Sequence, residues 1–214
     1  ERAQLMNEAV DNQPSTESNG NWFIAIMKQY GPMLLRGTGM TLLISLVGTI
    51  VGFIIGLLVG IIRTTPKPKK LGQRGLRAVI NWLLSLYIEV FRGTPMIVQA
   101  AVLYYGAAQA WHLNMDRTTA ALLIVSINTG AYISEIIRGG IISVDEGQFE
   151  AANALGMTHL QTMMKVILPQ AVRNSLPAVT NEFIVNIKDT SVLSVISVSE
   201  LFFSGETIAG QSFQ

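Results

Sequence analysis

The sequence contains no cysteine among its 214 residues. This absence excludes a disulfide framework, and it also excludes a thiolate nucleophile or a metal site built from thiolates. Charged residues are scarce as well, at 14% of the chain, whereas an average soluble domain carries about 25%. Because half of all residues are hydrophobic, this shortage of charge indicates a protein that lies in a lipid bilayer.

Several catalytic and nucleotide-binding patterns are also missing. No glycine-rich loop ends in Gly-Lys-Ser or Gly-Lys-Thr, so the sequence predicts no nucleotide site of the P-loop type on this chain. His112 and His159 are the two histidines, and they lie too far apart in the sequence to predict a metal site. No Gly-x-Ser-x-Gly elbow or catalytic triad is visible. The net charge of +1 gives no overall field that would attract nucleic acid.

Long apolar stretches predict an all-α integral membrane protein with four spans. About 20 apolar residues cross a bilayer, and the clearest stretch holds 25 residues without one charge. The second stretch is interrupted at Pro95, because proline removes a backbone donor and disfavours helix at the residue before it. The fourth is moderately apolar, and we expect it to be irregular. The four stretches are 38–62, 79–110, 118–137 and 171–203.

Glycine recurs at every fourth position of the first stretch. This spacing places the glycines along one face of a helix, where a neighbouring helix can approach closely. We expect packing between helices rather than a ligand site. The residues are Gly48, Gly52, Gly56 and Gly60.

Basic residues predict the topology. The segment 63–77 carries six lysines and arginines and no acidic residue, and such a segment beside a span stays in the cytoplasm. The N-terminus then lies outside, and the segment 143–169 is cytoplasmic. We expect 1–20 to be a polar extracytoplasmic linker or the tail of an upstream domain, and 21–214 to form the membrane domain.

Two short helices are predicted over 143–169. Asp145 stands at the start of the first helix, where an acidic side chain favours the helix dipole. Gly156 suits its C-terminal end. Thr158 can cap the second helix, which we expect to stop at Pro169.

A spaced pattern on this cytoplasmic segment resembles the EAA loop of permease subunits in bacterial ABC importers. The pattern is Glu150-Ala151-Ala152, Gly156 after three residues, and then Val166, Leu168 and Pro169, with valine where the family has isoleucine. The resemblance implies a coupling helix that docks on an ATPase subunit. Glu150, Ala151, Ala152 and Gly156 are therefore the predicted coupling residues.

Further motifs are similar to those of the polar amino acid uptake permeases over residues 30–210. They are Arg92-Gly93-Thr94-Pro95, Ala131-Tyr132 with Glu135, Arg138-Gly139-Gly140, Gly147-Gln148 and Lys188-Asp189-Thr190-Ser191. The resemblance implies the transmembrane domain of a type I ABC importer, whose fifth span would follow Gln214, in a prokaryotic cell membrane. It also implies two ATPase subunits holding ATP and magnesium, a second permease subunit (identical or different), and an extracytoplasmic amino acid binding protein or fused binding domain.

The substrate site is predicted from ionisable residues in the fourth stretch, because each costs roughly 2.5–3.5 kcal/mol to insert and usually faces a cavity or a partner. Lys188, with Thr190 and Ser191, can hold an α-carboxylate, and Glu182 can hold an amino group or a cationic side chain. The alternative is that Lys188 pairs with Asp189 and only braces the helix. In permeases that resemble this chain, glutamate and lysine at positions 182 and 188 face the central cavity.

Asn128 is the amide in the third stretch, and two roles stay open for it: it reads a substrate amide, or it bonds a neighbouring helix. It favours glutamine as the cargo, with a basic amino acid such as arginine or histidine as the alternative. Glu89 and Arg92 are spaced as an ion pair on one helix face. The more distant alternatives are a structural membrane subunit and an intramembrane enzyme that uses Glu182 or Asp189 as acid or base.

Overall fold

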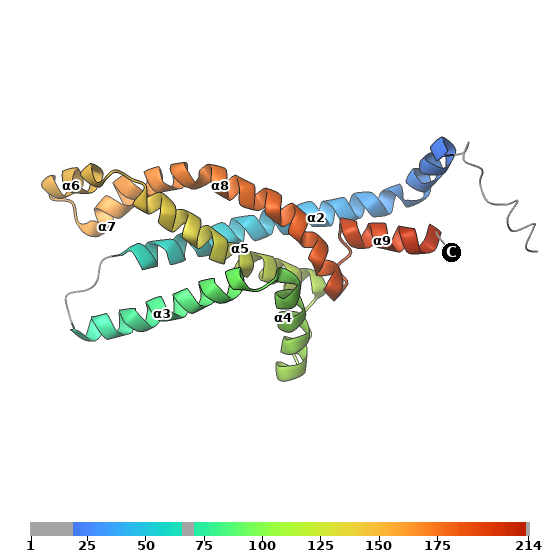
Figure 1. Ribbon diagram of the computed structural model, residues 1–214, viewed down its shortest axis with the longest axis horizontal. Helices are drawn as coiled ribbons and strands as arrows, with labels where there is room; N and C mark the ends of the chain where they lie inside the picture. Colours follow the sequence, from blue (N-terminus) through green and yellow to red (C-terminus); the bar gives the residue numbers. More distant parts are fainter. Residues whose placement is uncertain (1–18, 66–70, 213–214) are drawn as a thin grey trace, which may run out of the picture.

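The computed structural model describes residues 19–65 and 71–212, so most of the segment 1–20 and the centre of the segment 63–77 lie outside the described residues. Within the described ranges all regular secondary structure is helical (Figure 1). The elements are α2 (Asn19–Thr64), α3 (Leu71–Gly93), α4 (Met96–Trp111), α5 (Arg117–Ile142), α6 (Glu146–Ala154), α7 (His159–Thr162), the π-helix η2 (Met163–Ile167), α8 (Leu168–Asp189), the 3-10 helix η3 (Thr190–Ile196) and α9 (Leu201–Ser212).

Two helices, α2 and α5, are each long and apolar enough to cross a membrane. Two further pairs of helical segments qualify when each pair is taken as one bent span. The chain bends by 113° between α3 and α4, and by 55° between the segment 159–196 and α9. The described residues therefore hold two to four candidate spans. This range includes the four predicted from sequence, and the predicted irregularity of the fourth is the break at η3.

The glycine stripe of α2 packs against α5, as the spacing of the glycines predicts. An added Cβ at each of the four glycines would lie between 2.5 and 2.9 Å from a side chain of α5. The contacts advance by four residues on both helices together, and they pair Gly48 with Val125, Gly52 with Thr129, Gly56 with Ile133 and Gly60 with Ile137.

Two clusters of buried apolar residues hold the helices together. The first lies among α2, α4, α5 and η3 and includes Ile44, Ala100, Val125 and Leu193. The second lies among α5, η2 and α8 and includes Ile133, Ile137, Met163, Ile167 and Ala171. Because α5 contributes to both clusters, it forms the centre of the described fold.

The second helix of the cytoplasmic segment does not stop at Pro169, contrary to the prediction. Helix continues through η2 and α8 as far as Asp189, and Pro169 occupies the first turn of α8. In η2 the amide of Leu168 bonds to the carbonyl of Met163, five residues earlier. A π-bulge of this kind shifts the hydrogen-bond register, and proline is tolerated in the first turn of a helix.

Helix continues beyond the fourth apolar stretch, because α9 extends from Leu201 to Ser212. Glu200 lies directly before this helix, and only 1% of its surface is exposed. Its two carboxylate oxygens accept hydrogen bonds from the amides of Phe202 and Phe203, each at 2.7 Å. An anionic side chain at a helix N-terminus satisfies amides that have no partner inside the helix.

The described helix ends on either side of residues 66–70 lie at the same end of the molecule as the segment 143–169. Helices α6 and α7 lie at the same end as the C-terminal end of α2 and the N-terminal end of α3 (Figure 1). The end of α2 and the start of α3, which flank the basic segment, therefore lie at the same end as the residues of the EAA pattern.

Candidate functional site

A cavity of about 300 Å³ lies between the corner that joins α3 to α4, helix α5 and helix α8. Six of its nine lining residues are polar or charged, and none is a lysine or an arginine. Three of the predicted substrate residues meet here: Asn128, Glu182 and Asp189. The other lining residues are Thr94, Pro95, Met96, Tyr132, Val185 and Asn186.

Helix geometry explains why Glu182 and Asp189 share the cavity and Lys188 does not. Helix α8 is continuous over these positions. With 3.6 residues per turn, a separation of seven returns to nearly the same face, about 20° away, whereas a separation of six points about 120° away. Lys188 is accordingly exposed and does not line the cavity. A contact of Lys188 with a ligand held by Glu182 stays a prediction.

Thr190 and Ser191 also lie outside the lining. Thr190 is buried, and its hydroxyl donates to the carbonyl of Ile187 at 2.9 Å. The hydroxyl of Ser191 donates to the carbonyl of Lys188 at 2.7 Å. Both hydroxyl hydrogens are therefore bonded to backbone carbonyls in the last turn of α8. Neither of the two ion pairs found among the described residues joins Lys188 to Asp189, so the alternative of a bracing pair is not formed either.

Asn128 bonds neighbouring helices and also lines the cavity. Its Nδ2 donates to Oε1 of Gln99 in α4 at 2.9 Å and to the carbonyl of Phe91 in α3 at 3.2 Å. The bond to a neighbouring helix, one of the two predicted roles, is therefore present. Gln99 was not singled out from the sequence, although a glutamine four residues after Pro95 in an apolar stretch is a usable signal.

A buried set of polar side chains joins three helices beside the cavity. Asn186 of α8 donates through Nδ2 to the hydroxyl of Thr49 in α2 at 2.9 Å, and its Oδ1 accepts from the hydroxyl of Thr129 in α5 at 3.1 Å. All three residues are less than 9% exposed. Sequence reasoning missed this set, because each residue alone is an ordinary polar residue in an apolar stretch.

The predicted ion pair between Glu89 and Arg92 is not formed. Both side chains are exposed, and neither takes part in the two ion pairs among the described residues. The guanidinium of Arg92 instead lies 5.4 Å from the ring centroid of Tyr132, a cavity residue of α5. Arginine favours such a stacked position because its cation is attracted to the face of the ring.

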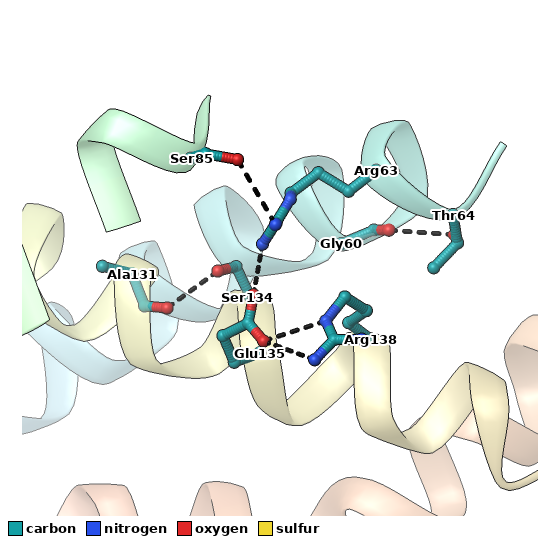
Figure 2. A network of polar contacts seen from close by, with 8 residues as sticks. All are labelled: Gly60, Arg63, Thr64, Ser85, Ala131, Ser134, Glu135 and Arg138. Carbon is teal, nitrogen blue, oxygen red and sulfur yellow. Dashed lines mark hydrogen bonds and ion pairs between the residues drawn. The ribbon is translucent and has the colours of Figure 1, made fainter. Parts of the chain in front are cut away.

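A carboxylate between two arginines ties α2 to α5 nearer the α6 end of the bundle (Figure 2). Glu135 accepts from Arg63 of α2 through one oxygen and from Arg138 of its own helix through the other, at 2.8 Å. Arg63 also donates to the hydroxyl of Ser85 in α3 at 3.4 Å. The sequence motif contained Glu135 and Arg138, but it did not predict that Arg63 completes the group.

The EAA segment has the turn that its glycine predicts. Gly156 has a φ of +72°, in the left-handed region that favours glycine. Its amide bonds to the carbonyl of Asn153, and the amide of Met157 bonds to the carbonyl of Ala152, which is the Schellman pattern at a helix end. Thr158 and Gln161 then form a capping box at the start of α7, as predicted for Thr158.

The four predicted coupling residues differ in exposure. Glu150, Ala151 and Gly156 are exposed, whereas Ala152 is 3% exposed and packs inside this chain. Leu155 and Leu160 flank the turn with 82% and 70% of their surfaces exposed. The exposed surface around the turn therefore combines Glu150 with the apolar side chains of Leu155 and Leu160.

Comparison with known proteins agrees with this arrangement. The family model of the binding-protein-dependent transport system inner membrane component matches residues 54–210. A glutamine transport system permease protein of Escherichia coli is 41% identical over 184 residues, covering 86% of this chain and 80% of that protein. An L-cystine transport system permease protein of Bacillus subtilis is 44% identical over 133 residues, covering 62% of this chain and 56% of that protein.

Solved structures agree in fold. A crystal structure of an amino acid ABC transporter with histidines superposes with a TM-score of 0.74 at 37% identity, and the match covers 88% of this chain and 83% of that one. A methionine ABC transporter in an inward-facing conformation superposes with a TM-score of 0.69 at 20% identity, which shows the fold alone. The chain belongs to the family of binding-protein-dependent transport system inner membrane components, and within it to the polar amino acid ABC importer permeases, which are membrane subunits and not themselves ATPases.

Proposed function

We propose that this permease carries its amino acid through the cavity between the α3–α4 corner, α5 and α8, by alternating access. The observation that carries the proposal is the pair Glu182 and Asp189 in that one cavity. A carboxylate within a membrane span is costly and marks a substrate or ion pathway by default. The lining contains no lysine or arginine, and the nearest cation that the structure places beside it is Arg92, which lies against Tyr132. A cationic group of the cargo is therefore a partner that suits the two acids.

Every free amino acid brings such a group in its α-ammonium. Charge-assisted hydrogen bonds from an ammonium to a carboxylate are about twice as strong as bonds between neutral groups. The side chain of the cargo would then contact Thr94, Asn128 or Tyr132 on the opposite elements. A contact between Lys188 and the α-carboxylate stays a prediction, which uptake by a Lys188→Met variant tests.

Glutamine is the favoured cargo. The support is the glutamine permease of Escherichia coli, whose similarity extends over 86% of this chain. A basic amino acid is the second candidate, because two carboxylates in one cavity suit a substrate with two positive groups. An arginine transport permease of Bacillus subtilis is also 41% identical, over 56% of this chain.

The partners follow from the two ends of the bundle. ATPase subunits with ATP and magnesium would bind at the α6 end, where Glu150, Leu155 and Leu160 are exposed. That end would be cytoplasmic, because the segment 63–77 is strongly basic. The N-terminus would lie outside, and residues 1–20 would link to a binding domain or precede a site for a separate binding protein. A second permease subunit would complete the pathway.

Uptake by the reconstituted complex tests the proposal. Permease, ATPase subunits and binding protein are placed in proteoliposomes, and ATP-dependent uptake of radiolabelled glutamine and arginine is measured. Glu182→Gln and Asp189→Asn should each lower uptake at least tenfold while the subunits still co-purify, whereas Glu89→Gln, at an exposed glutamate of the same membrane domain, should not. A thermal-shift panel of amino acids on the binding protein identifies the cargo.

Three results would overturn this proposal. Normal uptake by both cavity variants would remove Glu182 and Asp189 from the pathway. A complex that assembles with the ATPase but accumulates no amino acid would favour a structural subunit instead. An intramembrane enzyme would convert the amino acid inside the vesicles without ATP, which product analysis of the same samples detects.

A further inference from the structure

The corner between α3 and α4 contains a glutamine whose side chain completes the end of α3. A helix leaves its last carbonyls without partners inside the helix, and Pro95 has no amide hydrogen to offer them. Gln99 is only 6% exposed. Its Nε2 lies 2.9 Å from the carbonyl of Phe91, 2.9 Å from the carbonyl of Thr94 and 2.9 Å from the hydroxyl of Thr94. One amide group thus supports the 113° bend.

These bonds fix the orientation of two amides in succession. A backbone carbonyl only accepts hydrogen bonds, so Gln99 has to present its NH₂ group to Phe91 and Thr94. Its Oε1 then faces Asn128, which has to donate in turn. The Nδ2 of Asn128 is accordingly held by Gln99 and by the carbonyl of Phe91. If either side-chain amide were rotated by 180°, its oxygen would face another acceptor oxygen.

The atom of Asn128 that stays available is its oxygen. Asn128 lines the cavity together with Glu182 and Asp189. Within the described residues, two side-chain polar atoms are fully buried and have no hydrogen-bond partner, namely Asn81 Oδ1 and Thr162 Oγ1. Oδ1 of Asn128 is not one of them, so it is not fully buried. No described group donates to it, and both bonds of the side chain run through Nδ2. The amide group of this residue therefore offers a ligand an acceptor.

We propose that Gln99 is a specificity-determining positioning residue, which fixes the amide of Asn128 so that the cavity presents an acceptor oxygen beside its two carboxylates. The cavity then selects amino acids whose side chains carry N–H donors, an amide or a guanidinium, over analogues that carry an oxygen at that place. A site built to hydrogen-bond a donor rejects an analogue that lacks it, because buried polar groups are left unpaired. This inference rests on the proposed function and adds the side-chain chemistry to it.

Direct binding to the purified permease–ATPase complex, without binding protein, tests the inference. Two ligand pairs of equal charge are compared: glutamine with the γ-methyl ester of glutamate, and arginine with asymmetric ω-dimethylarginine. In each pair the second member has fewer N–H donors on its side chain while the charge stays the same, so the two carboxylates of the cavity do not by themselves separate the members. For the pair that the unaltered complex recognises, the member with more donors should bind at least about tenfold more tightly, which corresponds to about 1.4 kcal/mol. Gln99→Met, which removes both bonding groups, should reduce this ratio to threefold or less.

Three variants separate positioning from general damage. Gln99→Glu keeps an acceptor for Asn128, but only its protonated carboxyl can donate to the carbonyls of Phe91 and Thr94, so it should preserve more of the ratio than Gln99→Met does. Asn128→Ala removes the oxygen itself and should abolish the preference. Tyr105→Phe removes another hydrogen bond of α4, from its hydroxyl to the carbonyl of Val195 at 3.0 Å, and should leave the ratio as it is because Tyr105 lies outside the cavity.

The outcomes are distinguishable. The inference is overturned if the binding ratio of the two ligands is unchanged in Gln99→Met. If Gln99→Met does not co-purify with the ATPase, an unchanged ratio in Asn128→Ala overturns it. In both cases the proposed function still stands. Failure of the unaltered complex to bind either glutamine or arginine counts against the proposed function, and the inference falls with it.

Discussion

Gly56 of α2 and Ile133 of α5 lie so close that a Cβ on the glycine would be 2.7 Å from Cγ2 of the isoleucine. The backbone amide of Ser134 would be 2.8 Å from the same Cβ, and a backbone atom cannot move aside cheaply. Real Cβ atoms essentially never approach so closely. The contact between the two apolar spans therefore depends on the missing side chain.

Gly56→Ala should destabilise the membrane domain. Overpacking a well-packed contact costs about 1–3 kcal/mol, and the nearest atoms here include backbone. Thermal unfolding of the detergent-solubilised complex measures the loss. Gly39→Ala, in the same helix but with nothing within 4 Å of the added carbon, is the matched control, and it should be neutral or slightly stabilising. Equal melting temperatures for the two variants would contradict close packing at Gly56.

Glu135→Gln should weaken the attachment of α2 to α5 near the α6 end. It leaves Arg63 and Arg138 facing each other without the carboxylate that accepts from both. Because the three side chains keep 19–40% of their surfaces exposed, the cost should lie between that of an exposed and a buried pair, about 1–3 kcal/mol.

A double-mutant cycle with Arg63→Gln, read by thermal unfolding, checks this expectation. The two substitutions should be non-additive by at least about 0.5 kcal/mol. Additive losses would mean that the interaction drawn in Figure 2 does not contribute to stability.

Asn186→Leu should destabilise the bundle by about 1–3 kcal/mol, because the buried hydroxyl of Thr129 loses the oxygen to which it donates. Adding Thr129→Val should recover part of the loss, since replacing both partners with apolar groups can be nearly neutral. Chemical or thermal unfolding of the two variants side by side measures the recovery. A double variant that is less stable than Asn186→Leu would argue against this hydrogen bond.

Gly156→Ala should uncouple transport from ATP hydrolysis. The φ of +72° is strained for any residue with a Cβ, at a cost of roughly 1–2 kcal/mol, so the turn between α6 and α7 should shift. ATP hydrolysis by the complex should then rise less when loaded binding protein is added. Glu150→Lys should have the same effect through the exposed face. Gly139→Ala, with nothing within 4 Å, is the control, and normal stimulation in both test variants would count against a coupling role.

The sequence predicted features that depend on local spacing. The glycine face of α2, the break at Pro95 and the turn at Gly156 each follow from backbone chemistry within a few residues. The partner of the glycine face was not predictable, because it depends on how α5 crosses α2 much later in the chain. The same reason hides the bond between Asn186 and Thr49, which are 137 positions apart.

The substrate residues show a different limit. Glu182 and Asp189 were identified by their charge alone, and the structure brings them together. Lys188 was grouped with them by charge, although the helical repeat turns it away from the cavity. Pro169 was read as a helix end, because a π-bulge leaves no plain signature in one sequence. Charge in an apolar stretch identifies candidate substrate residues, whereas the helix face on which each residue lies determines which of them line the cavity.

The glycine contacts between α2 and α5 also restrict how the two helices can slide. Both repeats have a length of four residues, which corresponds to about 6 Å along a helix. A shift of one whole repeat would place each glycine against the next side chain and restore the fit, whereas a shift of half a repeat would drive side chains into the opposing backbone. The close contacts between α2 and α5 therefore disfavour sliding of these two helices by less than a whole repeat.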